Sequence, residues 1–193
     1  METVTIAEAW PRYGQEFTIE DLDKMPDDGH RYELLDGTLI VSPAPGLPHQ
    51  RVVAALISLL ESACPEDMVV FPNVNVRFAV ASALEPDVVV ASPPGISGAR
   101  LLRAPLLAVE ILSPDSALRD LSLKKAAYER FGVPSYWVVD PDLDRPTLRA
   151  FELSQGTYTE VAHVAGDQAF RAQRPFRAEV VPSHLVAKLR RAG

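Results

Sequence analysis

The stretch Leu106-Leu107-Ala108-Val109-Glu110-Ile111-Leu112 is an apolar run that only Glu110 interrupts. A short apolar run of this kind is typical of a strand that is buried on both faces of a sheet. Burying an unpaired carboxylate costs on the order of several kcal/mol, so a core strand rarely holds one without a partner or a chemical role. The stretch therefore predicts a central strand and a candidate site residue. A solvated strand face, or a structural pair with an arginine, is the alternative for Glu110.

The segments on either side of this strand predict an α/β (α+β) fold with a central mixed sheet and flanking helices. Asp36-Gly37 is a hairpin signal between strands, and residues 49–63 and 116–131 carry apolar side chains at helical spacing. A first helix is expected from Thr18 to about residue 25, and a last one over residues 183–191. Strands are expected at residues 31–35, 38–41, 68–71, 74–78, 87–91, 106–112, 136–139, 148–153 and 158–163. Residues 92–105 look like a Pro/Gly loop.

Length and composition limit the classes of protein. At about 150 residues per domain, 193 residues predict one domain. The formal net charge of −7 argues against a generic polycation that coats nucleic acid. The single cysteine, Cys64, excludes a disulfide framework and a Cys-rich zinc site. The sequence lacks the phosphate-loop, zinc-protease and serine-hydrolase motifs.

Two features concern the location of the protein. No apolar stretch is long enough to span a bilayer, and the first residues lack the basic and apolar regions of a signal peptide. We therefore expect a cytoplasmic protein without a membrane partner.

Three more charged residues occupy positions where charge is unusual. Asp87 leads directly into the apolar run 88–91, although a turn residue at a strand start is the alternative. Lys124 lies on the apolar stripe of the helix predicted over residues 116–131, where a lysine either extends to solvent or meets buried carboxylates. Glu33 lies in a short strand, where alternation could equally put it on the solvent side.

Together these residues indicate a chemistry. Carboxylates on neighbouring strands form a hard-oxygen site for Mg²⁺ or Mn²⁺, and a nearby ammonium can stabilise negative charge on a phosphate. We therefore expect the carboxylates and the lysine to gather at a pocket that is open to solvent. The chemistry that such a site supports is metal-assisted hydrolysis of phosphodiester bonds. Glycosidases also use paired carboxylates, but only 7% of the residues are aromatic, which disfavours a sugar cleft.

Several stretches also resemble the Uma2 family of restriction endonuclease-like proteins, over about residues 16–190. The resemblance rests on Tyr32-Glu33-Leu34-Leu35-Asp36-Gly37, Ser42-Pro43-Ala44-Pro45 with His49, Pro86-Asp87-Val88-Val89-Val90, Val109-Glu110-Ile111-Leu112-Ser113-Pro114, and residues 120–140 with Lys124 and Tyr128. It implies the PD-(D/E)xK nuclease fold for a single domain over residues 1–193.

The same resemblance assigns roles to residues. Asp87 and Glu110 would hold the metal, the backbone carbonyl of Ile111 could add a ligand, and Glu33 would be an additional acidic residue. The basic residue of the motif belongs two positions after Glu110, where this chain has Leu112. In Uma2-like sequences a lysine from the following helix takes its place, and Lys124 fits that position.

These observations support two hypotheses. The first is a Mg²⁺- or Mn²⁺-dependent DNA endonuclease, with Arg100 and Arg103 as candidate contacts to the DNA backbone. The second is a catalytically inactive interaction module that keeps the fold, in which arginine or lysine pairs with the buried carboxylates. His49 is expected to cap a helix or to be a satisfied core histidine. A homodimer is compatible with cutting both strands, but no motif specifies one.

Overall fold

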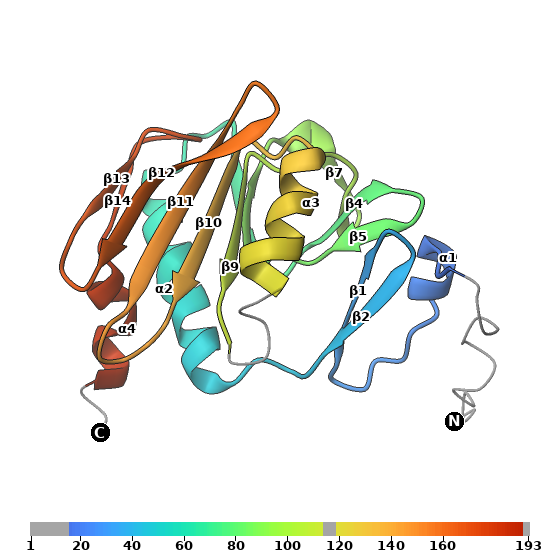
Figure 1. Ribbon diagram of the computed structural model, residues 1–193, viewed down its shortest axis with the longest axis horizontal. Helices are drawn as coiled ribbons and strands as arrows, with labels where there is room; N and C mark the ends of the chain where they lie inside the picture. The colour runs from blue at the N-terminus through green and yellow to red at the C-terminus, as the bar shows by residue number, and fades with distance from the viewer. Residues whose placement is uncertain (1–15, 114–118, 191–193) are drawn as a thin grey trace.

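The computed structural model describes residues 16–113 and 119–190. Two six-stranded sheets dominate them (Figure 1). We call the sheet with strand order β2-β1-β5-β4-β8-β7 the N-terminal sheet and the sheet with order β12-β11-β10-β9-β6-β3 the central sheet. A two-stranded sheet pairs β13 (Phe170–Ala172) with β14 (Ala178–Val180).

The N-terminal sheet begins with the predicted hairpin. β1 (Arg31–Leu35) and β2 (Thr38–Ser42) pair antiparallel, and Asp36 and Gly37 both adopt positive φ in the turn between them. The remaining strands are β4 (Asn75–Ala79), β5 (Ser82–Leu84), β7 (Ile96–Ser97) and β8 (Arg100–Leu101). β5 joins the hairpin to β4, so this sheet assembles segments that lie far apart in the sequence.

The central sheet is mixed. Its strands are β3 (Val69–Pro72), β6 (Val88–Ala91), β9 (Leu107–Ile111), β10 (Ser135–Asp140), β11 (Thr147–Ser154) and β12 (Thr157–Ala165). β9 and β10 are parallel and the other neighbours are antiparallel. Every residue of β9 is buried, as its apolar run predicts.

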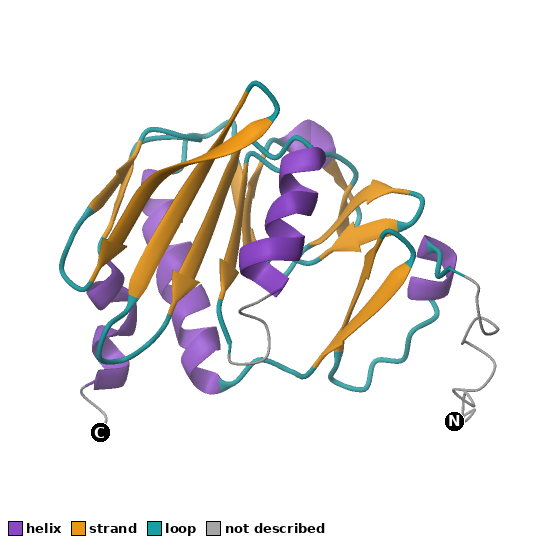
Figure 2. Ribbon diagram, viewed as in Figure 1, coloured by secondary structure: helices purple, strands orange, loops and turns teal. Residues whose placement is uncertain are grey.

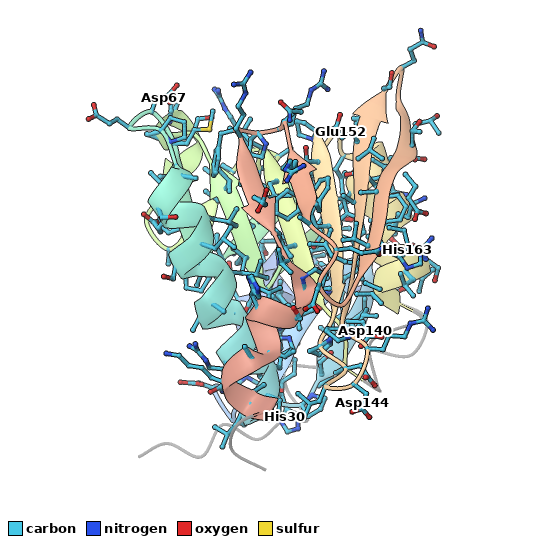
Figure 3. The ribbon with its side chains drawn as sticks, turned by 90° about the vertical axis from the view of Figure 1, so that its left-hand side faces the viewer. His30, Asp67, Asp140, Asp144, Glu152 and His163 are labelled. Carbon is cyan, nitrogen blue, oxygen red and sulfur yellow. The ribbon has the colours of Figure 1, made fainter. Side chains whose placement is uncertain are left out.

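Helices cover both faces of the central sheet. α2 (Leu47–Ala63) packs beside α4 (Pro182–Arg190) on one face, as Figure 3 shows. α3 (Lys125–Arg130) lies on the other face, on the side of the N-terminal sheet (Figure 2). It follows the π-helical segment η3 (Arg119–Lys124). α1 (Ile19–Leu22) begins after the capping residue Thr18, and η2 (Pro93–Gly95) is a short 3₁₀ turn.

The fold class is as predicted, but several details differ. A second six-stranded sheet accompanies the expected central one. Residues 92–105 are not simply a loop, because they contain η2, β7 and β8. α1 ends at Leu22 rather than near residue 25. The helix predicted over residues 116–131 is π-helical from Arg119 to Lys124, and its predicted start lies outside the described residues. The predicted end of the last helix, Arg191, also lies outside them. No described helix is long and apolar enough to cross a membrane.

Candidate active site

Asp87 and Glu110 are neighbours across two paired strands. β6 and β9 run antiparallel with Val88 opposite Val109, so the same register extended by one residue puts Asp87 opposite Glu110. Asp87 lies just before the first residue of β6, and its side chain reaches the backbone N–H of Ile111, the residue that follows Glu110. Glu110 points to the face covered by α3, because it accepts hydrogen bonds from that helical region. Both carboxylates are buried.

Lys124 joins two of the predicted acidic residues. Its Nζ lies 3.0 Å from Glu110 Oε1 and 2.9 Å from Glu33 Oε1. Glu110 belongs to the central sheet and Glu33 to β1 of the N-terminal sheet. The lysine therefore bridges the two sheets through their carboxylates, and its side chain is only 4% exposed.

The helical region supplies a second hydrogen-bond partner to Glu110. Tyr128 donates its phenolic hydrogen to Glu110 Oε1 over 2.7 Å. Burial, together with the negative charges of Glu110 and Glu33, raises the pKa of Tyr128 well above its usual value, so the phenol keeps the proton that it donates. Lys124 ends η3 and Tyr128 lies one turn later in α3, so both side chains reach the same carboxylate.

Asp87 has partners of its own. Its Oδ1 accepts a hydrogen bond from Arg31 over 2.9 Å, and its Oδ2 accepts one from the backbone N–H of Ile111 over 2.7 Å. His49 Nε2 lies 3.0 Å from the same Oδ2. Burial opposes the ionisation of Asp87, but His49, Arg31 and the N–H of Ile111 outweigh it and lower its pKa. Asp87 is therefore an ionised carboxylate fixed beside Ile111.

Arg31 and His49 were not identified from the sequence as partners of Asp87. Arg31 opens β1, where the sequence indicates no more than a strand residue, and 56 residues separate it from Asp87. Of the two roles expected for His49, the helix cap is wrong, because Gly46 is the N-cap of α2 and His49 lies inside the first turn. The other expected role, a histidine with a partner inside the fold, agrees with the contact between its Nε2 and Asp87. The signals for His49 were its position after a Pro-rich loop and its place in the stretch that resembles the Uma2 family.

The sequence predicted that the cluster would be open to solvent, but the structure buries it. The side chains of Glu33, Asp87 and Glu110 are each 2% exposed. A pocket of about 510 Å³ lies next to the cluster and is lined by Arg31 and Glu85, among other residues. Arg31 lines this pocket and also pairs with Asp87, while Glu85 contacts Arg31 from the pocket wall.

The buried charges provide a test of whether a divalent cation fits. Among the described side chains of this cluster, the three carboxylates Glu33, Asp87 and Glu110 share two permanently charged cations, Arg31 and Lys124. A divalent cation beside Asp87 and Glu110 would add positive charge where the carboxylates of this cluster outnumber these two cations.

The donor chemistry suits Mg²⁺ or Mn²⁺. No three His, Cys, Asp or Glu side chains in the described ranges are grouped closely enough to form a metal site by themselves. Mg²⁺ does not need such a cage, because it is usually held by one or two carboxylates and keeps several waters. The adjacent carboxylates of Asp87 and Glu110 therefore fit it.

The two arginines proposed to contact DNA lie away from the buried carboxylates. Arg100 pairs with Asp23 over 2.7 Å, and its side chain is 43% exposed. Arg103 is exposed in the segment after β8. Arg100 also lines the 510 Å³ pocket that Arg31 and Glu85 border, so it shares a pocket with Arg31, the partner of Asp87.

Comparison with known proteins identifies the family. A family model named Uma2 and described as "Putative restriction endonuclease" matches residues 19–183. One similar solved structure is described as a "putative nuclease belonging to DUF820 from Anabaena variabilis ATCC 29413"; it is 19% identical, with a TM-score of 0.70, over 90% of this chain and 99% of that chain. At that identity the likeness shows a shared, nuclease-like fold. No curated protein matches the chain. Since the family match spans most of the 193 residues, the chain belongs to the Uma2 family.

Proposed function

We propose that this protein is a Mg²⁺- or Mn²⁺-dependent DNA endonuclease of the cytoplasm that hydrolyses phosphodiester bonds. The observation that carries the proposal is the adjacent, buried pair Asp87 and Glu110 with Lys124 in contact. Chains seldom bury such charges together, and a cluster of this kind in a nuclease-like fold suits chemistry on a charged substrate. Membership of the Uma2 family supports the same reaction class.

Asp87 and Glu110 would hold the divalent ion, with the backbone carbonyl of Ile111 and the carboxylate of Glu33 assisting. When bound, the ion would polarise the scissile phosphate and lower the pKa of an attacking water. The protein's own contribution is to keep these oxygens in place. Tyr128 and Lys124 hold Glu110, and the N–H of Ile111 holds Asp87. Such outer contacts orient the ligands of a metal site.

Lys124 would act directly on the substrate. A buried ammonium stabilises negative charge more strongly than an exposed one because little water screens it. Its Nζ already lies against Glu110, so a phosphate that reaches Glu110 would also meet this cation. Lys124 would thus take the role of the motif's strand lysine, whose position is occupied by Leu112 in this chain.

Arg100 and Arg103 would contribute contacts to the DNA backbone. Such contacts position a duplex without reading its sequence. A homodimer would bring two sites to the two strands, and sedimentation of the free protein tests for it.

Cleavage of plasmid DNA with Mg²⁺ or Mn²⁺ tests the proposal. Asp87→Asn and Lys124→Met are expected to abolish cutting, since one removes a ligand charge and the other removes the cation. Lys125→Met is the matched control, because Lys125 is the next residue and lies over the Phe151 ring instead, 4.8 Å from its centre. Circular dichroism verifies that each variant is folded. Equal cutting by the wild type and all variants would mean that the activity is a contaminant.

A second function, a non-catalytic interaction module, is favoured by one observation. The carboxylates already have protein partners and are almost fully buried, as structural ion pairs would be. Calorimetric titration with Mn²⁺ separates the two: a metal site gives binding heat that Glu110→Gln removes, whereas a structural cluster gives none.

A further inference from the structure

Arg31 lies at the boundary between the buried cluster and the pocket of about 510 Å³ that it lines. Its side chain is 14% exposed, whereas that of Asp87 is 2% exposed. One guanidinium nitrogen lies 2.9 Å from Asp87 Oδ1. The rest of the guanidinium faces Glu85, with Nε 3.7 Å from Oε1 and the other terminal nitrogen 3.4 Å from the backbone oxygen. Arg31 is thus shared between a buried carboxylate and one on the pocket wall.

The two carboxylates hold Arg31 differently. Asp87 gives it a close, buried ion pair, while Glu85 is 26% exposed and makes only the longer contact. A small rotation of the arginine side chain toward the pocket would exchange the first partner for the second. The pocket has room for such a movement, since a guanidinium group is far smaller than about 510 Å³.

A divalent cation and the guanidinium group compete for Asp87. Both are positive, and at contact distance in a buried site they repel each other strongly. A metal ion that binds Asp87 must therefore either displace Arg31 or bind in spite of it. In either case the arginine reduces the affinity of the site for the ion.

We propose that Arg31 is a positioning residue that keeps Asp87 in place in the absence of a divalent cation and moves to Glu85 when the cation binds. This inference rests on the proposed metal-dependent function. It adds a built-in counter-ion to the site, so that the carboxylates stay together and ionised before the metal arrives.

The sign of the effect on metal affinity distinguishes this role from a purely structural one. If Arg31 only braced Asp87, then removing it would disorder the ligand and weaken metal binding. If Arg31 competes with the metal, removing it strengthens binding. Arg31→Gln removes the charge but keeps a polar side chain, and Arg31→Lys keeps the charge but loses the planar fork that contacts two groups at once.

Titration of the full chain with Mn²⁺, followed by calorimetry, tests the proposal. Arg31→Gln is expected to bind Mn²⁺ about tenfold more tightly than the wild type, a change of about 1.4 kcal/mol. Arg31→Lys is expected to fall between the two. The control Arg130→Gln removes the same charge from an exposed arginine that pairs with Asp36, and its affinity should stay within about twofold of the wild type, because surface charges are screened.

A second measurement follows the arginine itself. In a spectrum of ¹⁵N-labelled arginine side chains, the wild-type Arg31 signal, assigned from its absence in Arg31→Gln, should shift on addition of diamagnetic Mg²⁺. The Arg130 signal should stay unchanged.

The outcomes separate this proposal from the proposed function. If the wild type cuts DNA and binds Mn²⁺ but Arg31→Gln, folded, binds it equally or more weakly, the role of Arg31 is overturned and the nuclease stands. If neither protein binds Mn²⁺, both proposals fall. Should Arg31→Gln not fold, an affinity of Arg31→Lys at or below that of the wild type overturns the proposal in the same way.

Discussion

Replacing Lys124 by methionine should destabilise the protein strongly, because one ammonium serves two buried carboxylates. Its Nζ lies 2.9 Å from Glu33 and 3.0 Å from Glu110, and all three side chains are at most 4% exposed. Removing one partner of a buried ion pair costs about 3–5 kcal/mol, since it leaves a buried charge without compensation. Two carboxylates are affected here, so we expect the upper part of that range.

For a chain of this size each kcal/mol shifts the melting temperature by about 2–4 °C, so a fall of roughly 10–20 °C is expected. The measurement is urea and thermal unfolding by circular dichroism in EDTA, so that no metal ion replaces the lysine. Lys125→Met is the control and should cost at most about 1 kcal/mol, because it loses only a partly exposed contact with an aromatic ring.

The double variant Glu33→Gln/Lys124→Met tests the cause. It removes one of the two uncompensated charges. Its free energy of unfolding should therefore exceed that of Lys124→Met alone by about 1–3 kcal/mol. If Lys124→Met unfolds at the same urea concentration as Lys125→Met, then the bridge between the carboxylates does not stabilise the fold and the reasoning fails.

Two further predictions concern neighbouring groups. Tyr128→Phe should lower the free energy of unfolding by about 1.5–3 kcal/mol, because it removes a hydrogen bond to a charged, buried carboxylate; urea unfolding measures it, and a loss below about 0.5 kcal/mol would contradict that role. Glu85→Gln should raise the melting temperature at pH 7 and leave it unchanged near pH 4. Burial, outweighing the attraction of Arg31, raises the pKa of Glu85 above its usual 4.5, so its contribution to stability is present below that pH and is lost as the pH rises through the folded-state value. An equal change at both pH values would show that the charge of Glu85 is not the cause.

The sequence predicted those parts of the fold that depend on local pattern. The Asp36-Gly37 turn, the helix predicted over residues 49–63 and the buried strand around Glu110 each carry their signal within a few residues, although that helix begins at Leu47. Lys124 was identified because its helical stripe is otherwise apolar, and the structure puts it against Glu110 and Glu33. Its catalytic role, like those of Asp87 and Glu110, stays a prediction.

The remaining features depend on contacts between distant segments. β5, β7 and β8 contain only two or three residues each, too few to show a period, and the prolines and glycines around residues 92–105 hide the last two. The pairing of Asp87 with Arg31 and His49 spans 56 and 38 residues. No local pattern encodes such partners, since an arginine that opens a strand and a histidine in a first helical turn are common on surfaces.

The bridge of Lys124 between Glu110 and Glu33 also limits how these residues can change during evolution. Lys124, Glu110 and Glu33, which the proposed reaction uses together with Asp87, also connect two separate sheets. A lineage that lost its substrate could not discard one of the charges without weakening the junction. These positions should therefore vary as a set, either retained together or exchanged together for an uncharged packing of similar volume.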